Sequence, residues 1–163
     1  MHIEAKLDAL GLVLPEQLSV PSMRLPFAQV RFRGNRAYIS GHGPQSPDGS
    51  VALPLGKVGA EVSLDEGYHA ARLTALAILA DLKRTLGDLD RVTAWLRVFG
   101  MVNSAPGFAQ QPVVINGFSD LILELYGPEI GQHARSAVGM AELPFRIPVE
   151  IEAEVEISEG RYL

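Results

Sequence analysis

The segment from Val149 to Ser158 constrains the fold most, because apolar and acidic residues alternate in it without interruption. Its apolar positions are Val149, Ile151, Ala153, Val155 and Ile157, and the residues between them are glutamates. Successive side chains of a β-strand point to opposite faces, so this spacing predicts a strand with one face in the core. The chain is therefore expected to build a sheet that is covered on one side.

Two other segments have helical periodicity. Between Leu64 and Leu86 apolar residues recur at helical spacing, Ser63 and Glu66 form a capping-box pattern before them, and Gly87 supplies a stop. A second helix is expected from Phe108 to Tyr126. Each is long enough to cover much of a sheet.

The remaining strands complete the order strand-strand-helix-strand-helix-strand-strand. A hairpin is expected from Ala28 to Phe32 and Ala37 to Ser40, and further strands from Val92 to Val102 and from His133 to Leu143. This order predicts an α+β fold with one sheet covered by two long helices. One domain is expected over residues 1–163, with a short N-terminal helical extension in 1–23 and a core in 24–158.

The strand from His133 to Leu143 carries the small residues of the predicted sheet. A period of two places Arg135, Ala137, Gly139 and Ala141 on one face. We expect the two helices to leave this face uncovered and a neighbouring subunit to contact it. The neighbouring subunit would then complete a pocket that contains Arg135.

Composition excludes several classes of site. The 163 residues include no cysteine, which removes thiol nucleophiles, disulfides and thiolate metal ligands. His2, His69 and His133 have no ligand spacing, so no metal is expected. No phosphate-binding glycine motif is present, because Gly41-His42-Gly43 lacks a third glycine, and no cofactor is expected.

The charge and hydropathy patterns limit the kinds of binding partner that we expect. Fourteen basic and nineteen acidic residues give a net charge of -5, which disfavours nucleic acid as a partner. The most apolar stretch, Leu73 to Leu82, is too short to span a bilayer. The first residues do not have the pattern of a secretory signal, so we expect a cytoplasmic protein without a membrane partner.

Several short motifs stand in a recognisable order. They are Pro26-Phe27-x-Gln29, Tyr38-Ile39-Ser40-Gly41, Ile115-Asn116, Arg135-Ser136, Leu143-Pro144 and Val149-Glu150-Ile151. Together they resemble the RidA/YjgF family of reactive intermediate deaminases over roughly residues 24–158. The resemblance implies a chorismate-mutase-like fold assembled as a homotrimer, with a central barrel of three sheets and pockets between subunits.

The resemblance also implies a reaction and its residues. The family's deaminases hydrolyse enamines and imines such as 2-aminoacrylate to 2-keto acids and ammonia. Arg135 then corresponds to the arginine that binds the substrate carboxylate, and Glu150 to the glutamate that holds the attacking water. The backbone next to Gly41 is expected to contact substrate. The remaining expected substrate-binding positions are Phe27, His42, Asn116 and Ala137.

The chain departs from the deaminase pattern at three of these positions. Ala137 stands where cysteine is usual, Phe27 where tyrosine is usual and His42 where glutamine is common, and an insertion precedes Asn116. Three functions therefore stay open: a hydrolase of small carboxylated imines, a trimer that binds a keto acid or amino acid without catalysis, and an endoribonuclease. The acidic charge makes the endoribonuclease the least favoured. His42 is interpreted either as a general base or as a hydrogen-bonded loop residue.

Overall fold

A computed structural model describes residues 2–159 of the chain. Its helices are α1 (Ile3–Ala9), α2 (Leu64–Leu86) and α3 (Gln111–Gly131), with short 3-10 turns η1 (Leu89–Arg91) and η2 (Pro144–Arg146). Its strands are β1 (Val30–Arg33), β2 (Arg36–His42), β3 (Val92–Asn103), β4 (Ala134–Met140) and β5 (Val149–Ile157).

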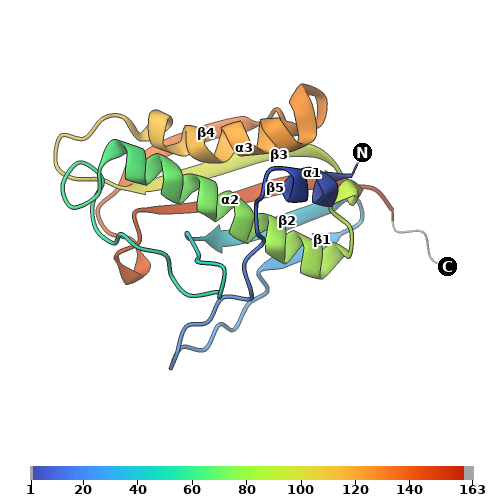
Figure 1. The fold of residues 1–163 in the computed structure, drawn as a ribbon, viewed down its shortest axis with the longest axis horizontal. Coiled ribbons are helices and arrows are strands. Elements are labelled where there is room, and N and C mark those ends of the chain that lie inside the picture. Colours follow the sequence, from blue (N-terminus) through green and yellow to red (C-terminus); the bar gives the residue numbers. More distant parts are fainter. Residues whose placement is uncertain (1, 160–163) are drawn as a thin grey trace.

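The strands form one sheet in the order β1-β2-β5-β3-β4, in which β3 and β4 are parallel and the other neighbours antiparallel. Helices α2 and α3 lie side by side over one face of this sheet (Figure 1). The predicted α+β architecture, with one sheet covered on one side, is therefore confirmed. Strand β5 lies at the centre, and its apolar residues are buried as the alternation predicted.

Helix α2 has the predicted ends. Ser63 and Glu66 form both hydrogen bonds of the capping box, and Gly87 ends the helix with a φ of 82°. A left-handed residue at this position favours glycine, which has no Cβ. None of the helices in residues 2–159 is both apolar enough and long enough to cross a membrane.

Helix α3 differs from the prediction at both ends. It begins at Gln111 instead of Phe108, and Pro112 lies in its first turn. Proline fits there because its missing N–H has no helical acceptor to lose. The predicted end at Gly127 is a break, with a φ of 72°, after which a further short turn runs to Gly131.

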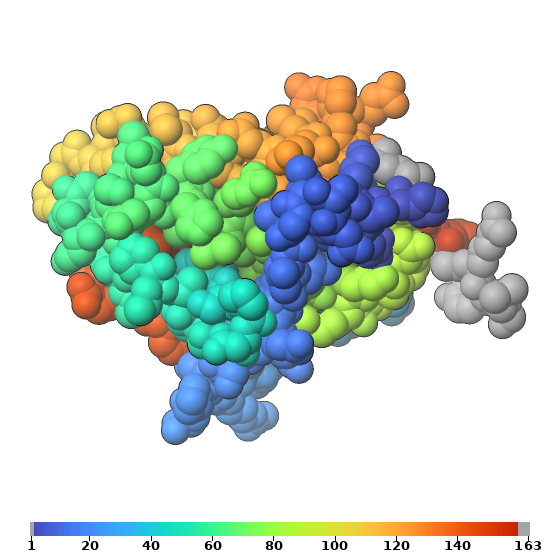
Figure 2. Space-filling model, viewed as in Figure 1, coloured from blue at the N-terminus to red at the C-terminus, as the bar shows by residue number. Residues whose placement is uncertain are grey.

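The N-terminal segment belongs to the same core. Ile3 and Leu7 of α1 are fully buried among the core residues, and the backbone N–H of Ile3 donates to Asp90 Oδ1 at 2.9 Å. The segment between α1 and β1 then leaves the body as a long loop, which projects at the lower edge of Figures 1 and 2. This loop forms one wall of the cavity described below.

The expected position of the small-residue face of β4 is wrong. Arg135 pairs with Val98 and Ala137 with Gly100, and both β3 residues are buried on the helix side of the sheet. A Cβ on Gly100 would lie 2.6 Å from Ile115 of α3. Helix α3 therefore covers the face that we expected to be open, because the small residues make room for it.

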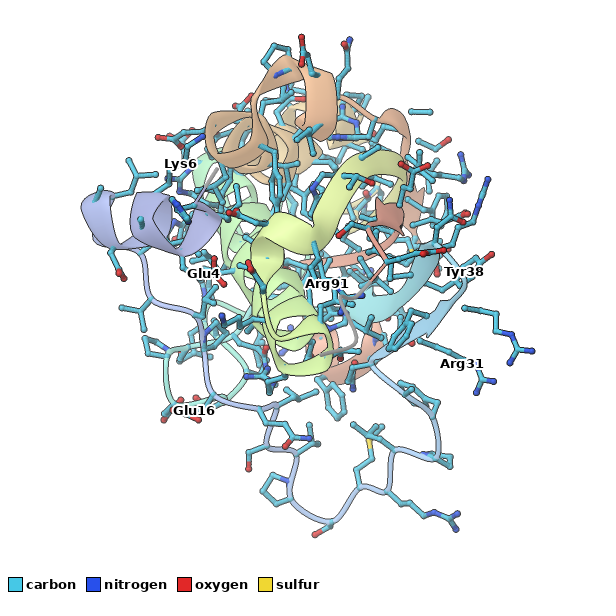
Figure 3. All side chains as sticks on the ribbon, turned by 90° about the vertical axis from the view of Figure 1, so that its right-hand side faces the viewer. Glu4, Lys6, Glu16, Arg31, Tyr38 and Arg91 are labelled. Atoms are coloured by element: carbon cyan, nitrogen blue, oxygen red, sulfur yellow. The ribbon has the colours of Figure 1, made fainter. Side chains whose placement is uncertain are left out.

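The uncovered face of the sheet is polar and aromatic. Tyr38 and Arg31 project from it on the side away from the helices (Figure 3), and the glutamates of β5 lie on the same face. Arg36 Nη1 and Glu154 Oε1 form an ion pair there at 2.6 Å.

Candidate functional site

The residues predicted to form one site lie in two places within the chain. Arg135, Asn116 and Ala137 lie where β4 meets α3, and we call this group, with Ser119 and His133, the Arg135 cluster. Gly41, His42, Phe27 and Glu150 line a cavity of about 280 Å³ at the end of β2 and ahead of the start of β1, which we call the Glu150 cavity.

Helix α3 orients the guanidinium of Arg135. Arg135 Nη1 donates to Asn116 Oδ1 at 2.9 Å and to Ser119 Oγ at 3.1 Å, and Nη2 donates to the carbonyl of Pro112 at 3.2 Å. Asn116 and Ser119 are three residues apart and so share one face of the helix. The sequence predicted Asn116 in the site, but not Ser119, although this spacing was a signal for it.

The charge of Arg135 has no ionic partner within residues 2–159. Burial lowers the pKa of the half-buried Arg135, and the charge of Asp120 partly opposes this. No carboxylate among residues 2–159 forms an ion pair with Arg135. Its guanidinium has more N–H donors than these three hydrogen bonds use, so it can still bind an anion in a bidentate manner.

His133 extends the Arg135 cluster. Its Nδ1 lies 2.7 Å from the carbonyl of Gly131, and its Nε2 lies 2.8 Å from Ser119 Oγ. Burial lowers the pKa of His133, and so does the charge of Arg135, although the Gly131 carbonyl opposes both. A neutral ring fits the contacts, because Nδ1 donates to the carbonyl and Nε2 accepts from Ser119, whose oxygen accepts from Arg135.

Glu150 lies against the backbone of β2. A Cβ on Gly41 would come within 2.3 Å of Glu150 Oε1, so a glycine allows the carboxyl group to approach the strand. Burial raises the pKa of Glu150, the charge of Glu152 adds to this, and that of His42 opposes it. Within residues 2–159 no hydrogen bond to the Glu150 carboxyl group is found.

His42 is held by two acceptors. Its Nε2 lies 2.9 Å from Asp81 Oδ2, and its Nδ1 lies 2.5 Å from the carbonyl of Ser40. Asp81 also accepts from Arg84 Nε at 2.9 Å and pairs with its Nη2 at 2.8 Å. His42 is therefore a hydrogen-bonded residue of the cavity wall, which agrees with the second of the two interpretations of this residue.

Asp81 was not predicted from the sequence. Burial acts to raise its pKa, but the hydrogen bonds and charges of His42 and Arg84 outweigh burial and lower it. The available signal was a single acid within the most apolar stretch of α2, where a buried charge requires partners. Its partner His42 lies far away in the sequence.

One chain cannot bring Arg135 and Glu150 to the same small ligand. They lie on β4 and β5, with β3 between these strands, and their β3 partners Val98 and Met101 are three positions apart. This corresponds to about 10 Å across the sheet and about 10 Å along it. They also lie on opposite faces, because Arg135 turns to α3 and Glu150 belongs to the uncovered face.

One acidic group resembles a cation site but has another role. Among the described residues, oxygens of Glu4, Asp88 and Asp90 lie within 4.8 Å of one another. Glu4 accepts from Lys83 at 2.6 Å, and Asp88 caps η1 through the N–H of Asp90. The contact between Glu4 and Lys83 joins α1 to the end of α2.

Comparison with known proteins places the chain in a family. The model of the family described as "YjgF/chorismate mutase-like, putative endoribonuclease" matches residues 4–148. The chain belongs to this family. Its fold is accordingly the YjgF/chorismate-mutase-like fold, as the motifs predicted, and the match includes most of α1.

Its relatives cover nearly the whole chain. Protein TCP17 of Trypanosoma cruzi is 38% identical over 157 residues, which are 96% of this chain and 95% of TCP17. The crystal structure of Atu1372 from Agrobacterium tumefaciens, a protein of unknown function, is 41% identical with a TM-score of 0.86, over 96% of this chain and 92% of that one. A Shewanella oneidensis protein with the endoribonuclease description is 30% identical with a TM-score of 0.85, over 96% and 100%.

Proposed function

We propose that the chain hydrolyses small carboxylated enamines and imines, of the 2-aminoacrylate type, to 2-keto acids and ammonia. The site would lie between subunits of a homotrimer, where Arg135 of one chain meets Glu150 of the next. The observation that carries this proposal is the guanidinium of Arg135, which α3 orients and which has no carboxylate partner in the described part of the chain. A guanidinium of this kind suits a bidentate bond to a substrate carboxylate.

Glu150 serves the chemical step. With the substrate carboxylate on Arg135, a water oxygen bonds to the imine carbon while Glu150 takes a proton from that water. Glu150 returns this proton to the substrate nitrogen, which gives a carbinolamine. The hydroxyl proton of the carbinolamine then moves to the nitrogen, the carbon–nitrogen bond breaks as the carbonyl forms, and ammonia and a 2-keto acid are released. The raised pKa of Glu150 supports this role, because a carboxyl group closer to neutral pH can both accept and return a proton.

The arrangement of charges supports a site between chains. Arg135 and Glu150 are both half-buried and carry opposite charges, and neither forms an ion pair with another described residue. One chain keeps them apart. A symmetric oligomer can bring different faces of two copies together. The uncovered sheet face, with its aromatic and charged side chains, is the surface that a trimer would bury.

A second candidate is a trimer that binds a keto acid or amino acid without turnover. Ala137 and Phe27 favour it, since each replaces a polar side chain usual in the deaminases. The endoribonuclease description of relatives is less suitable, because the net charge is -5 and glutamates line the uncovered sheet face. Both features repel a phosphate backbone.

The test is calorimetric titration of Arg135→Ala and Arg135→Lys with pyruvate and 2-oxobutyrate. Arg135→Ala should weaken carboxylate binding by about 3 kcal/mol with the trimer intact on a sizing column, because a charge-assisted bond is lost. Lysine should restore only part, since it lacks the guanidinium fork. The matched control is Arg72→Ala, whose partner Glu124 lies at 3.5 Å on the outer helix surface.

Three results would change the proposal. If Arg135→Ala binds keto acids as the wild type does, the arginine is structural and the deaminase proposal fails. If the variant dissociates, Arg135 is first an interface residue. If binding is lost with the trimer intact, but the wild type does not hydrolyse 2-aminoacrylate, the binding function replaces the enzymatic one.

A further inference from the structure

The Glu150 cavity is larger than hydrolysis of the smallest imines requires. Its volume is about 280 Å³. Benzene fills an apolar protein cavity of about 150 Å³, and 2-aminoacrylate and pyruvate have as many non-hydrogen atoms as benzene. A ligand of their size would leave much of this cavity empty.

The walls that enclose the extra space are apolar and come from outside the sheet. The loop between α1 and β1 contributes Leu18, Met23, Leu25 and Phe27, and the η2 turn contributes Phe145. Phe27 is 55% exposed, Met23 47% and Phe145 44%, although all three line the cavity. A ligand that covers these side chains removes apolar surface from water, which favours its binding.

The polar groups of the cavity define one end of the ligand. His42 and Asp81 bond to each other and to groups outside the cavity, so they have little left to offer. Glu150 is the titratable residue of the wall without a hydrogen bond among residues 2–159. A fitting ligand therefore has its reacting, polar end at Glu150 and an apolar remainder.

We propose that the Glu150 cavity holds a branched aliphatic side chain, such as isobutyl, on the imine carbon of the substrate. This inference rests on the proposed function and deepens it: the preferred substrates are 2-imino acids of larger aliphatic amino acids. The loop between α1 and β1 then determines specificity, since it supplies Leu18, Met23, Leu25 and Phe27 to the apolar wall.

The first test compares keto acids that differ only in side chain. Pyruvate, 2-oxobutyrate and 4-methyl-2-oxopentanoate are titrated into the full-length wild type by calorimetry. Each buried methylene group strengthens binding by about fourfold, so the dissociation constant should fall at least about tenfold from the first to the last. Equal affinities, or weaker binding of the branched acid, would overturn the inference.

Two wall variants locate the effect. Leu25→Ser and Met23→Ser should each abolish most of the preference, so that the dissociation constant of 4-methyl-2-oxopentanoate approaches that of pyruvate for the same variant. Met23 is exposed, so its variant should fold even if Leu25→Ser does not. The control is Val13→Ser, because Val13 is apolar, 60% exposed and outside the cavity lining. Wall variants that keep the full preference would place the side chain elsewhere and overturn the inference.

A neutral probe separates this inference from the proposed function. The ketone 4-methyl-2-pentanone has the isobutyl group but no carboxylate, so its binding should depend on Met23 and Leu25 and not on Arg135. If Arg135→Ala leaves keto acid binding unchanged while the ketone still requires the wall, the proposed function fails and the cavity stands. If keto acids require Arg135 but show no preference and the ketone does not bind, the cavity inference fails alone; a neighbouring chain filling the cavity would give this result.

Discussion

The Arg135 cluster and the Glu150 cavity bury charge in opposite ways. Arg135 receives three hydrogen-bonding partners from one helix, all acceptors that suit its charged form. Glu150 lies among apolar loop residues, and burial favours its neutral form. In the proposed reaction the two groups have different tasks, because a fixed charge suits recognition and a carboxyl group of raised pKa suits proton transfer.

The same contrast recurs between two acids of one cavity. Asp81 and Glu150 both line it, yet the pKa of Asp81 is lowered by His42 and Arg84, while that of Glu150 is raised by burial. Carboxyl groups whose environments move their pKa values apart have different roles. Asp81 stays ionised and holds the wall, and Glu150 remains available for a proton.

The largest expected effect is on the free energy of unfolding, and it concerns Asp81. Asp81→Ala should lower the free energy of unfolding by about 3 kcal/mol, because it leaves His42 and Arg84 without their buried partner. Urea unfolding followed by circular dichroism measures the change. Glu142→Ala is the control, since its side chain is 77% exposed and 3.5 Å from Lys57, and it should have almost no effect. Equal effects would mean that the Asp81 network does not support the cavity.

A slightly smaller effect is expected for Glu150, the proposed proton-transfer residue. Glu150→Gln should lower the rate of 2-aminoacrylate hydrolysis about a hundredfold, the usual loss for a positioned acid-base group. Keto acid affinity should stay nearly unchanged, because the proposed site holds the carboxylate through Arg135 and not through Glu150. Steady-state kinetics and calorimetry on the same preparation separate the two quantities. Equal losses of affinity and rate would show that Glu150 maintains the pocket instead.

The sequence predicted those features of the fold that depend on a single helix or strand. The alternation from Val149 to Ile157 and the capping box at Ser63 are local, and the structure confirms both. The period of two also grouped Arg135 with Ala137 correctly. The face of the sheet on which this group lies is determined by the parallel pairing of β4 with β3 and by the packing of α3. The sequence of β4 alone does not reveal these contacts.

The Glu150 cavity depends on contacts between distant parts of the chain, and the periodicity of the sequence could not predict them. Asp81 meets His42 across 39 positions, and the loop containing Met23 and Leu25 has no helical or strand pattern. Glu150 and Gly41 were predicted through the family motifs, and the structure brings them into contact. The apolar walls of the Glu150 cavity were not predicted from the sequence, because they form only where the loop folds against the end of β2.

The smallest effect concerns pH and the Arg135 cluster. The pKa of His133 is lowered in the folded chain, so the unfolded chain binds its proton more readily. Stability is therefore retained above the ordinary histidine value of about 6.5 and lost as pH falls below it. His133→Gln should lose less stability than wild type between pH 7.5 and pH 5.5, roughly the histidine range. Urea unfolding measures this, with exposed His69→Gln as the control; identical pH dependence of wild type and His133→Gln would mean that His133 is not held neutral.

The most direct test of a site shared between chains is subunit mixing. Arg135→Ala and Glu150→Gln are each expected to be nearly inactive, since each disables every site of its own trimer. When the two are unfolded together and refolded as mixed trimers, about a quarter of the sites should combine an intact Arg135 with an intact Glu150 from the next chain. We predict that hydrolysis of 2-aminoacrylate then returns to about a quarter of the wild-type rate. A mixture no more active than the two variants measured separately would contradict a site built from two chains.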